Sequence, residues 1–533
     1  MRDDGRRIGL AGAVLSVLLI GPGAAAAPGD VRLVDAARHQ DQVQVRALLT
    51  QRVDVNARSE DGSTALLWAA QWNDVATADL LIHAGANANA ANDFRVTPLS
   101  LACTNGSAAL VERLLKAGAR PDTPIATGET PIMTCSSSGS TDAVRMLIAR
   151  GADVNAREPA ENQTALMWAA SEHHSDVVRA LIGAGADRQA RTKKGFTALH
   201  FAAREGDLEV TRRLLGAGVD VNIRSEPEPV GRGRGKAEGL KDGRTASGAA
   251  AGGAFAPAGS APRGPAYQAT LSVGSTPLLV ATLRGHVPLA LVLLEHGADP
   301  NIGDAGFTPL HWAAGTWESG PSNPVYGFTD PMSGIPGRQA KLQLVKALLD
   351  RGANPNGRMT QRPPGFAGGY EDAPGATPFL LACAAADLEL MRLLLAAGAD
   401  PAHATDSGTT PVMAASGLNR GIGESPIAEE QALAVVKFLI TLGGDARGAT
   451  TNGENALFGA AYRGWNTLLA LLIDHGADVN AVSKAGVTPW LAASGFGDRL
   501  GGVLYNKEGA DLLLAHGADP KLGRPCQAQN KCR

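Results

Sequence analysis

One pattern of apolar and polar positions recurs along the chain and predicts a pair of short helices in each copy. A copy opens on a head such as Thr64–Leu66 and continues through small residues such as Ala69–Ala70. A second apolar cluster follows, as at Leu80–Leu81, and ends at a glycine, here Gly85. A head Thr can cap the first helix, a Pro after it suits the first helical position, and the glycine can end the second helix. The pattern therefore predicts helix–turn–helix units.

The heads of these units recur at a nearly constant spacing. Where no insertion intervenes, successive heads are 32 to 34 residues apart. A unit of this size cannot bury its apolar face alone, so the copies are expected to stack into an all-α solenoid. The heads begin at Thr64, Thr97, Thr130, Thr164, Thr197, Thr276, Thr308, Thr377, Thr410, Asn455 and Thr488.

The head Thr308-Pro309-Leu310-His311, combined with this period, resembles the ankyrin-repeat family. The resemblance extends over residues 33–520, and a copy at 33–56 that lacks the Thr-Pro head is interpreted as an N-terminal cap. The resemblance implies an ankyrin-repeat solenoid of about twelve repeats in two blocks, with hairpin-like turns between helix pairs. It also implies that the turns and first helices form a concave surface for a protein partner.

Interruptions of the repeat pattern divide the chain. Residues 223–273 are rich in Gly, Ala, Pro and Arg, a composition that cannot bury a core, so they are expected to form a disordered linker or loop. They separate an N-terminal block at 28–222 from a C-terminal block at 274–520, with a tail at 521–533. The sequence leaves open whether the two blocks form one continuous stack.

Five cysteines are too few for a disulfide framework. Cys103, Cys135 and Cys383 replace small residues of the repeat and are interpreted as buried thiols. Cys526 and Cys532 lie in the tail, where an oxidising compartment would favour a small disulfide loop between them.

Insertions distinguish the C-terminal block. Three alternate repeats carry 23, 12 and 8 extra residues between their first and second helices, and 13 more follow Asn356. Equivalent points of a solenoid project from one edge, so the three insertions are expected on the same edge. Such an edge is either a binding face or a set of tolerated surface loops. The insertions contain many of the chain's few aromatic residues: Trp317, Tyr326, Phe328, Phe366, Tyr370, Phe496 and Tyr505.

The N-terminus predicts export. Arg2, Arg6 and Arg7 precede an apolar run at 8–20, and small residues at 24–27 follow it, as in a secretory signal peptide at 1–27. The apolar run is too short for a permanent membrane anchor. The mature protein is therefore expected to be periplasmic or secreted, with no membrane span after removal of the signal.

Charge and motifs argue against several other classes. The formal net charge of −3 gives no field for binding nucleic acid. The common metal, phosphate and acyl-transfer motifs are missing, so no catalytic, metal-binding or cofactor-binding residues are predicted and no cofactor is expected. Most histidines stand at repeat positions and are interpreted as structural. The inserted acids form no pair that the spacing identifies: Asp330, Glu371, Asp372, Glu424 and Asp498.

The sequence therefore predicts a scaffold without catalysis that binds a protein partner of unknown identity. The alternatives are an accessory or inhibitor-like protein that clamps an exported enzyme, an enzyme with a site formed by the insertions, and a secreted effector directed at a host. The candidate partner-binding residues occupy variable repeat positions or the insertions: Trp72, Phe196, Arg204, Glu205, Phe307, Trp317, Tyr326, Phe328, Tyr462, Arg463, Phe496 and Tyr505.

Overall fold

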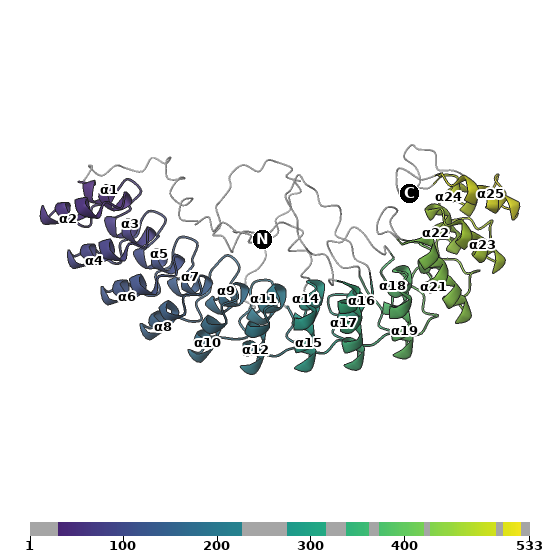
Figure 1. Cartoon of the computed structure of the whole chain (residues 1–533), viewed down its shortest axis with the longest axis horizontal. Helices are drawn as coiled ribbons and strands as arrows, with labels where there is room; N and C mark the ends of the chain where they lie inside the picture. Colours follow the sequence, from purple (N-terminus) through teal and green to yellow (C-terminus); the bar gives the residue numbers. More distant parts are fainter. Residues whose placement is uncertain are drawn as a thin grey trace, which may run out of the picture. The chain divides into compact units, whose positions relative to one another are not determined.

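The predicted all-α repeat fold is confirmed. The computed structural model describes residues 30–225, 274–315, 337–361, 372–419, 427–496 and 505–523. Within these ranges the chain forms successive pairs of short helices, and none of the described residues belongs to a strand (Figure 1). The described helices make twelve pairs, in agreement with the predicted number of repeats.

The helices divide between two compact units. Unit 1 contains the described residues up to Asp220 together with Ser225, and unit 2 contains Val221–Arg224 and the described residues from 274 onward. Unit 1 comprises α1 (Arg32–Arg38), α2 (Gln42–Thr50), α3 (Ala65–Gln71), α4 (Val75–His83), α5 (Pro98–Thr104), α6 (Ala108–Lys116), α7 (Pro131–Ser137), α8 (Thr141–Ala149), α9 (Ala165–Ser171), α10 (Ser175–Gly183), α11 (Ala198–Glu205) and α12 (Leu208–Gly216).

Unit 2 repeats the same arrangement with longer interruptions. It comprises α14 (Pro277–Leu283), α15 (Val287–Glu295), α16 (Pro309–Ala314), α17 (Arg338–Asp350), α18 (Pro378–Ala384), α19 (Leu388–Ala396), α20 (Pro411–Ala415), α21 (Glu429–Thr441), α22 (Ala456–Arg463), α23 (Asn466–Asp474), α24 (Pro489–Ala493) and α25 (Lys507–Ala515).

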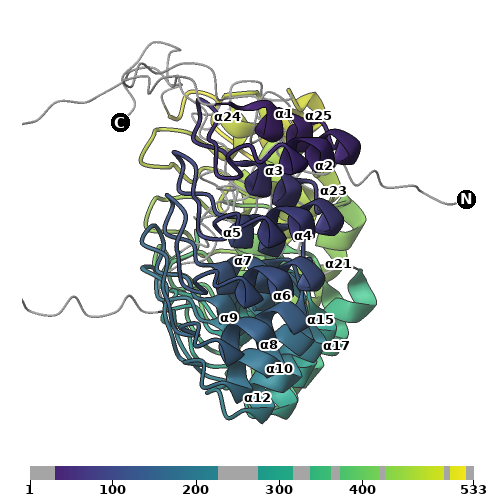
Figure 2. The same ribbon diagram turned by 90° about the vertical axis from the view of Figure 1, so that its left-hand side faces the viewer.

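Each unit is built of two rows of helices. In unit 1 the first helix of each pair packs against the first helices of the neighbouring pairs, as in α3·α5 and α7·α9. The second helices likewise contact one another, as in α4·α6 and α10·α12. Figure 2, in which α1 to α12 face the viewer, shows the two rows of this unit. The core lies between the rows, where residues such as Leu66 and Leu81 are fully buried.

The ends of the helices follow the predicted capping chemistry. The hydroxyl oxygen of Thr276 accepts a hydrogen bond from the backbone N–H of Leu279 at 3.2 Å, and Pro277 occupies the first helical position. Gly85 ends α4 with a positive φ of 91°, a conformation that costs glycine little. The pair α1–α2 lacks a side-chain cap at Val31, which fits its interpretation as a terminal repeat.

A ladder of asparagine side chains joins consecutive turns. The Asn89 side chain donates to the carbonyl of Gly118 at 2.9 Å and accepts from the backbone N–H of Arg120 at 2.8 Å. The same pair of bonds links each ladder residue to the following repeat, so side chains, and not backbone pairing alone, fix the repeat-to-repeat register. The ladder residues that make both bonds are Asn56, Asn89, Asn155, Asn222, Asn301, Asn356 and Asn480.

The interpretation of Cys103 and Cys135 as buried thiols is wrong. The two residues form a disulfide, with their Cα atoms 4.3 Å apart. They stand on α5 and α7, first helices of consecutive repeats, which pack side by side and bring the two sulfurs together. Cys383 is a buried free thiol as predicted, and burial raises its pKa well above the ordinary value.

Most of the inserted residues lie outside the described part of the chain. Residues 316–336, 420–426 and 497–504, which lie between first and second helices, are outside the described residues, as are 362–371. Part of the first two insertions becomes helix: α17 and α21 each have 13 residues, whereas most second helices have 9. The predicted signal peptide at 1–27, residues 226–273 of the linker predicted at 223–273, and Cys526 and Cys532 also lie outside the described residues. Ile223 and Ser225, which the prediction assigned to the linker, are buried.

Candidate protein-binding surfaces

One stripe of side chains runs along the first helices of unit 1. It consists of the fourth and eighth residues after each head, which lie one helical turn apart on the same face. We call it the first-helix stripe. The stripe has aromatic residues toward both ends and smaller side chains in the middle, in the two repeats that the Cys103–Cys135 disulfide joins. Its members in chain order are Trp68, Trp72, Leu101, Asn105, Thr134, Ser138, Trp168, Glu172, Phe201 and Glu205.

Trp72 presents the largest accessible ring at the first end of this stripe. Its side chain is 37% exposed, and its ring stacks on that of Trp68 with 6.3 Å between the ring centroids. The indole N–H of Trp72 donates to the carbonyl of Arg38 at 2.9 Å, and the Arg38 guanidinium lies 5.0 Å from the Trp68 ring centroid. These contacts hold an exposed aromatic ring in a fixed orientation, as an interface anchor requires.

Charged residues gather at the other end of the stripe. Arg204 and Glu205 form an ion pair of 2.6 Å, and the Arg204 guanidinium lies 4.8 Å from the Phe201 ring centroid. Burial raises the pKa of the half-buried Glu172, and Glu205 adds to the rise, whereas His174, His173 and Arg204 oppose it. The structure therefore brings the predicted residues Arg204 and Glu205 together with Glu172, which the sequence analysis did not single out.

The aromatic residues that precede two heads differ in their accessibility. Phe196 is half-buried, and its ring meets His200 edge to face at 5.5 Å. Phe307 is only 1% exposed, and its ring lies 6.5 Å from that of Trp312. Phe307 thus contributes to packing, because its side chain is not on the accessible surface where the sequence analysis placed it.

The last repeats of unit 2 carry a second group of candidates. Tyr462 and Arg463 are half-buried at the end of α22, and the Arg463 guanidinium lies 5.4 Å from the Trp465 ring centroid. Phe496 and Tyr505 are 46% and 65% exposed. They flank the third insertion, and Phe496 occupies the same repeat position as Trp72, eight residues after its head. Trp72 in unit 1 and Phe496 in unit 2 are therefore exposed aromatic residues at equivalent repeat positions.

The remaining inserted candidates lie outside the described residues. These are Trp317, Tyr326, Phe328, Phe366 and Tyr370 among the aromatic residues, and Asp330, Glu371, Glu424 and Asp498 among the acids.

Asp372 is the inserted acid that the structure describes. One of its carboxylate oxygens accepts hydrogen bonds from the hydroxyl groups of Thr405, Ser407 and Thr409 at 2.5, 2.6 and 2.6 Å. Three donors on one oxygen tie the turn that precedes α18 to the next turn. The Asp372 carboxylate therefore has a structural role, which is to bind these three hydroxyl groups.

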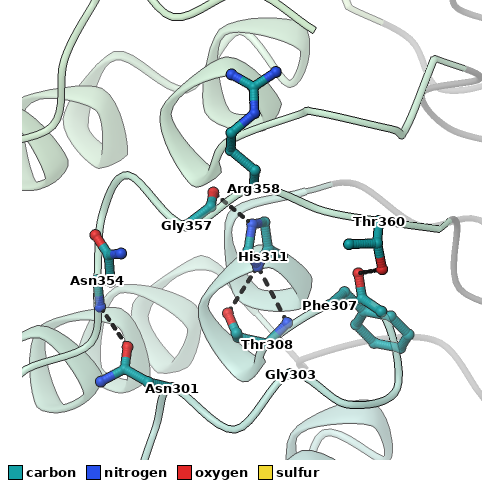
Figure 3. A pocket seen from close by; sticks show the side chains of 10 residues that line it. Asn301, Gly303, Phe307, Thr308, His311, Asn354, Gly357, Arg358 and Thr360 are labelled. Atoms are coloured by element: carbon teal, nitrogen blue, oxygen red, sulfur yellow. Dashed lines mark hydrogen bonds between the residues drawn. The ribbon is translucent and has the colours of Figure 1, made fainter. Parts of the chain in front are cut away.

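A hollow of about 410 Å³ lies between two neighbouring turns of unit 2 (Figure 3). His311 lines it, and burial lowers the pKa of this imidazole to about 4. Its Nε2–H donates to the carbonyl of Gly357 at 2.9 Å, and its Nδ1 accepts from the backbone N–H of Thr308 at 3.1 Å. Arg358 pairs with Asp406 at 2.7 Å. The ring nitrogens thus bond backbone groups of the head and of the next turn, in agreement with the structural interpretation of the repeat histidines.

Neither a metal-ligand cluster nor a helix able to span a membrane is found within the described ranges. No group of three or more His, Cys, Asp or Glu side chains there is arranged to hold a metal ion. Among those same residues, no helix is both long enough and apolar enough to span a bilayer.

Sequence comparison agrees with this architecture. The family pattern described as "Ankyrin repeats (3 copies)" matches residues 76–158, 157–225 and 427–523. The pattern described as "Ankyrin repeat" matches residues 273–305, 305–359 and 375–407. Together the matches cover most of the chain, which belongs to the ankyrin-repeat family. Proteins of this family are generally scaffolds for protein–protein interaction.

Among solved structures, the chain is similar to the human ASB11 ankyrin repeat domain. The two sequences are 29% identical, the match covers 36% of this chain and 86% of that chain, and the TM-score is 0.34. No curated protein matches the chain.

Proposed function

We propose that this ankyrin-repeat protein is an exported, non-catalytic scaffold that holds a protein partner on its first helices and on the bases of its insertions. The observation that carries the proposal is the pair of exposed aromatic side chains at one repeat position, Trp72 in unit 1 and Phe496 in unit 2. Large aromatic side chains are frequent anchors of protein interfaces. Stacking on Trp68 and the hydrogen bond to the carbonyl of Arg38 hold the Trp72 ring in place, so little conformational entropy of this side chain is lost on binding.

The Cys103–Cys135 disulfide supports the proposed export. Structural disulfides form and persist in oxidising compartments and are rare where thiols are kept reduced. Both cysteines are fully buried, so the bond has the surroundings of a structural link. It agrees with the signal peptide expected at 1–27, and we place the mature protein in a periplasm or outside the cell.

The proposal is tested by crosslinking in the producing cell followed by affinity capture of the mature chain. The variants are Trp72→Ala and Phe496→Ala, which remove the two exposed rings on which the proposal rests. Val43→Ala is the control, because Val43 is an exposed apolar residue, 80% accessible, on the second-helix row of unit 1.

We expect a specific protein to be captured by wild type and by Val43→Ala, and to be lost or reduced at least about tenfold in one ring variant. The variant that loses the partner identifies the surface used. Capture that is equal in all four proteins would exclude both surfaces, and the absence of any specific partner would argue against the scaffold.

A further inference from the structure

One partly buried carboxylate of unit 1, that of Glu172, lacks a bonding partner among the described residues. Glu172 caps the C-terminal end of α9, is half-buried, and belongs to the first-helix stripe. Within the described part of the chain, its side-chain oxygens take part in no hydrogen bond or ion pair. A carboxylate that has lost part of its hydration without gaining a partner is costly for the free protein.

Aromatic side chains and a second carboxylate lie near Glu172. Trp168 lies one helical turn before Glu172 on the same face of α9. The next first helix, α11, packs against α9 and carries Phe201 and Glu205. Neighbouring helices therefore place two aromatic rings and two carboxylates close together, of which Phe201 is 9% exposed and Glu205 is paired with Arg204.

Two of the three basic side chains whose charge acts on Glu172 have acidic partners, whereas the third, His174, bonds the carbonyl of Ser137 at 2.9 Å. Arg204 pairs with Glu205 at 2.6 Å, and His173 lies 3.0 Å from the carboxylate of Asp207. Glu172 is the acid that has no ion-pair partner. This end of the stripe therefore carries an excess of negative charge. An acidic partner would be repelled here, whereas a cationic side chain would supply the missing counter-charge.

We propose that Trp168, Glu172, Phe201 and Glu205 form a site for a basic segment of the protein partner. A Lys or Arg side chain of that segment pairs with Glu172, and its apolar stem lies along the Trp168 ring. This inference rests on the proposed scaffold function, because it names the chemistry of the partner that the scaffold holds.

The test uses a phage-displayed library of random twelve-residue peptides selected on the full mature chain. We expect the selected peptides to be enriched in Arg or Lys. A selected peptide is then synthesised, together with a version in which its basic residue is replaced by glutamine, and the affinity of both is measured by calorimetry.

Glu172→Gln is the decisive variant, since it removes the charge and keeps the shape. We expect it to weaken the basic peptide at least about tenfold and to leave the glutamine peptide unchanged. Glu209→Gln is the matched control: it removes an acid of the same unit that lies exposed on α12 in an ion pair with Arg213. It should leave both affinities unchanged. Thermal unfolding checks that each variant is folded.

The contrary outcomes separate this inference from the proposed function. Peptides that bind without Arg or Lys, or a basic peptide that binds Glu172→Gln as tightly as wild type, would overturn the basic-segment site and leave the scaffold in place. Equal weakening by Glu172→Gln and Glu209→Gln would reduce the effect to general electrostatics and overturn the site as well. A library that yields no binding peptide would count against both proposals.

Discussion

At the scale of single residues, the close packing around Gly459 requires a residue without a side chain. This glycine lies in α22, four residues after its head, where other repeats place Trp68 or Trp168. A β-carbon at Gly459 would collide with the backbone of the neighbouring turn at 416–418. Backbone atoms cannot rotate aside, so Gly459→Ala is expected to lower the free energy of unfolding by about 1–3 kcal/mol.

The control for this prediction is Gly183→Ala. Gly183 also lies in a helix, α10, but no atom stands near the position of an added β-carbon. Alanine is the better helix former, so this change should raise the stability by roughly 0.5–1 kcal/mol. Urea unfolding followed by circular dichroism measures both variants. Equal stability of Gly459→Ala and wild type would contradict the close approach of the turn.

A buried acid predicts a dependence of stability on pH. Burial raises the pKa of Glu129 above its ordinary value of 4.5, and Glu158 adds to the rise, although a hydrogen bond from Thr127 lowers it. The folded state thus holds the Glu129 proton more tightly than the unfolded state does. The stability contribution of protonated Glu129 is present below pH 4.5 and is lost as the pH rises through the higher folded pKa.

Glu129→Gln should therefore be more stable than wild type at pH 7, and the difference should shrink on acidification to pH 4. Urea midpoints measured across this range give the comparison. Glu209→Gln, on the exposed side of α12, serves as the control. A stability gain that is the same at pH 4 and pH 7 would show that the carboxylate charge is not the cause.

At the scale of elements, the asparagine ladder predicts where a repeat boundary can be strengthened. Ala402 occupies the ladder position after α19, four residues beyond Gly398, and has no side chain to reach the next repeat. An asparagine there would face the carbonyl of Gly443 and the backbone N–H of Asp445, as Asn356 faces Gly398 and Asp400. Two added bonds should stabilise unit 2 by about 1–3 kcal/mol.

The reverse change, Asn356→Ala, should destabilise the same unit by a similar amount, since it removes both bonds. Chemical denaturation of Ala402→Asn, Asn356→Ala and wild type tests the pair of predictions. A destabilised Ala402→Asn variant would mean that the turn at 400–402 does not have the geometry of the other turns.

The disulfide links two first helices, and its removal should lower the stability of unit 1. Joining residues 32 apart in sequence constrains the unfolded chain, so Cys103→Ala/Cys135→Ala is expected to cost about 2–4 kcal/mol. Wild type treated with a reductant should approach the variant. Cys383→Ala is the control, because the reductant should lower the stability of this variant as much as that of wild type. Mass spectrometry of the non-reduced digest should contain the Cys103 and Cys135 peptides as one species.

The sequence predicts the helices well because their signals are local. Thr caps, Pro at the first helical position and Gly at the end act within one turn, so the bounds of elements such as α14 follow from their own residues. The Cys103–Cys135 pair required a contact between repeats. The two cysteines stand at different positions of their own units, six and five residues after the heads, and only the side-by-side packing of α5 and α7 brings them together.

The candidate site was predicted only in part for the same reason. The variable positions led to Trp72, Arg204 and Glu205, which the structure places at the C-terminal ends of first helices. Position alone could not distinguish the buried ring of Phe307 from an accessible one, because its burial comes from packing against Trp312. Nor could it identify Glu172, whose significance depends on which cations the neighbouring repeat has already engaged.

At the scale of the whole molecule, the two units imply regional unfolding. In a repeat array each helix pair contacts mainly its neighbours, so a local change is felt most strongly nearby. The disulfide lies within unit 1 and Gly459 lies within unit 2. A change at either feature should therefore perturb one unit without the other.

Hydrogen exchange followed by mass spectrometry resolves the response of each unit. We expect reduction of Cys103–Cys135 to accelerate exchange in α3 to α9 and to leave α20 to α25 unchanged. Gly459→Ala should do the opposite, because its clash is with the turn between α20 and α21. Acceleration across both units by either change would instead mean that the chain unfolds as one cooperative body, and a single free energy of unfolding would then describe it.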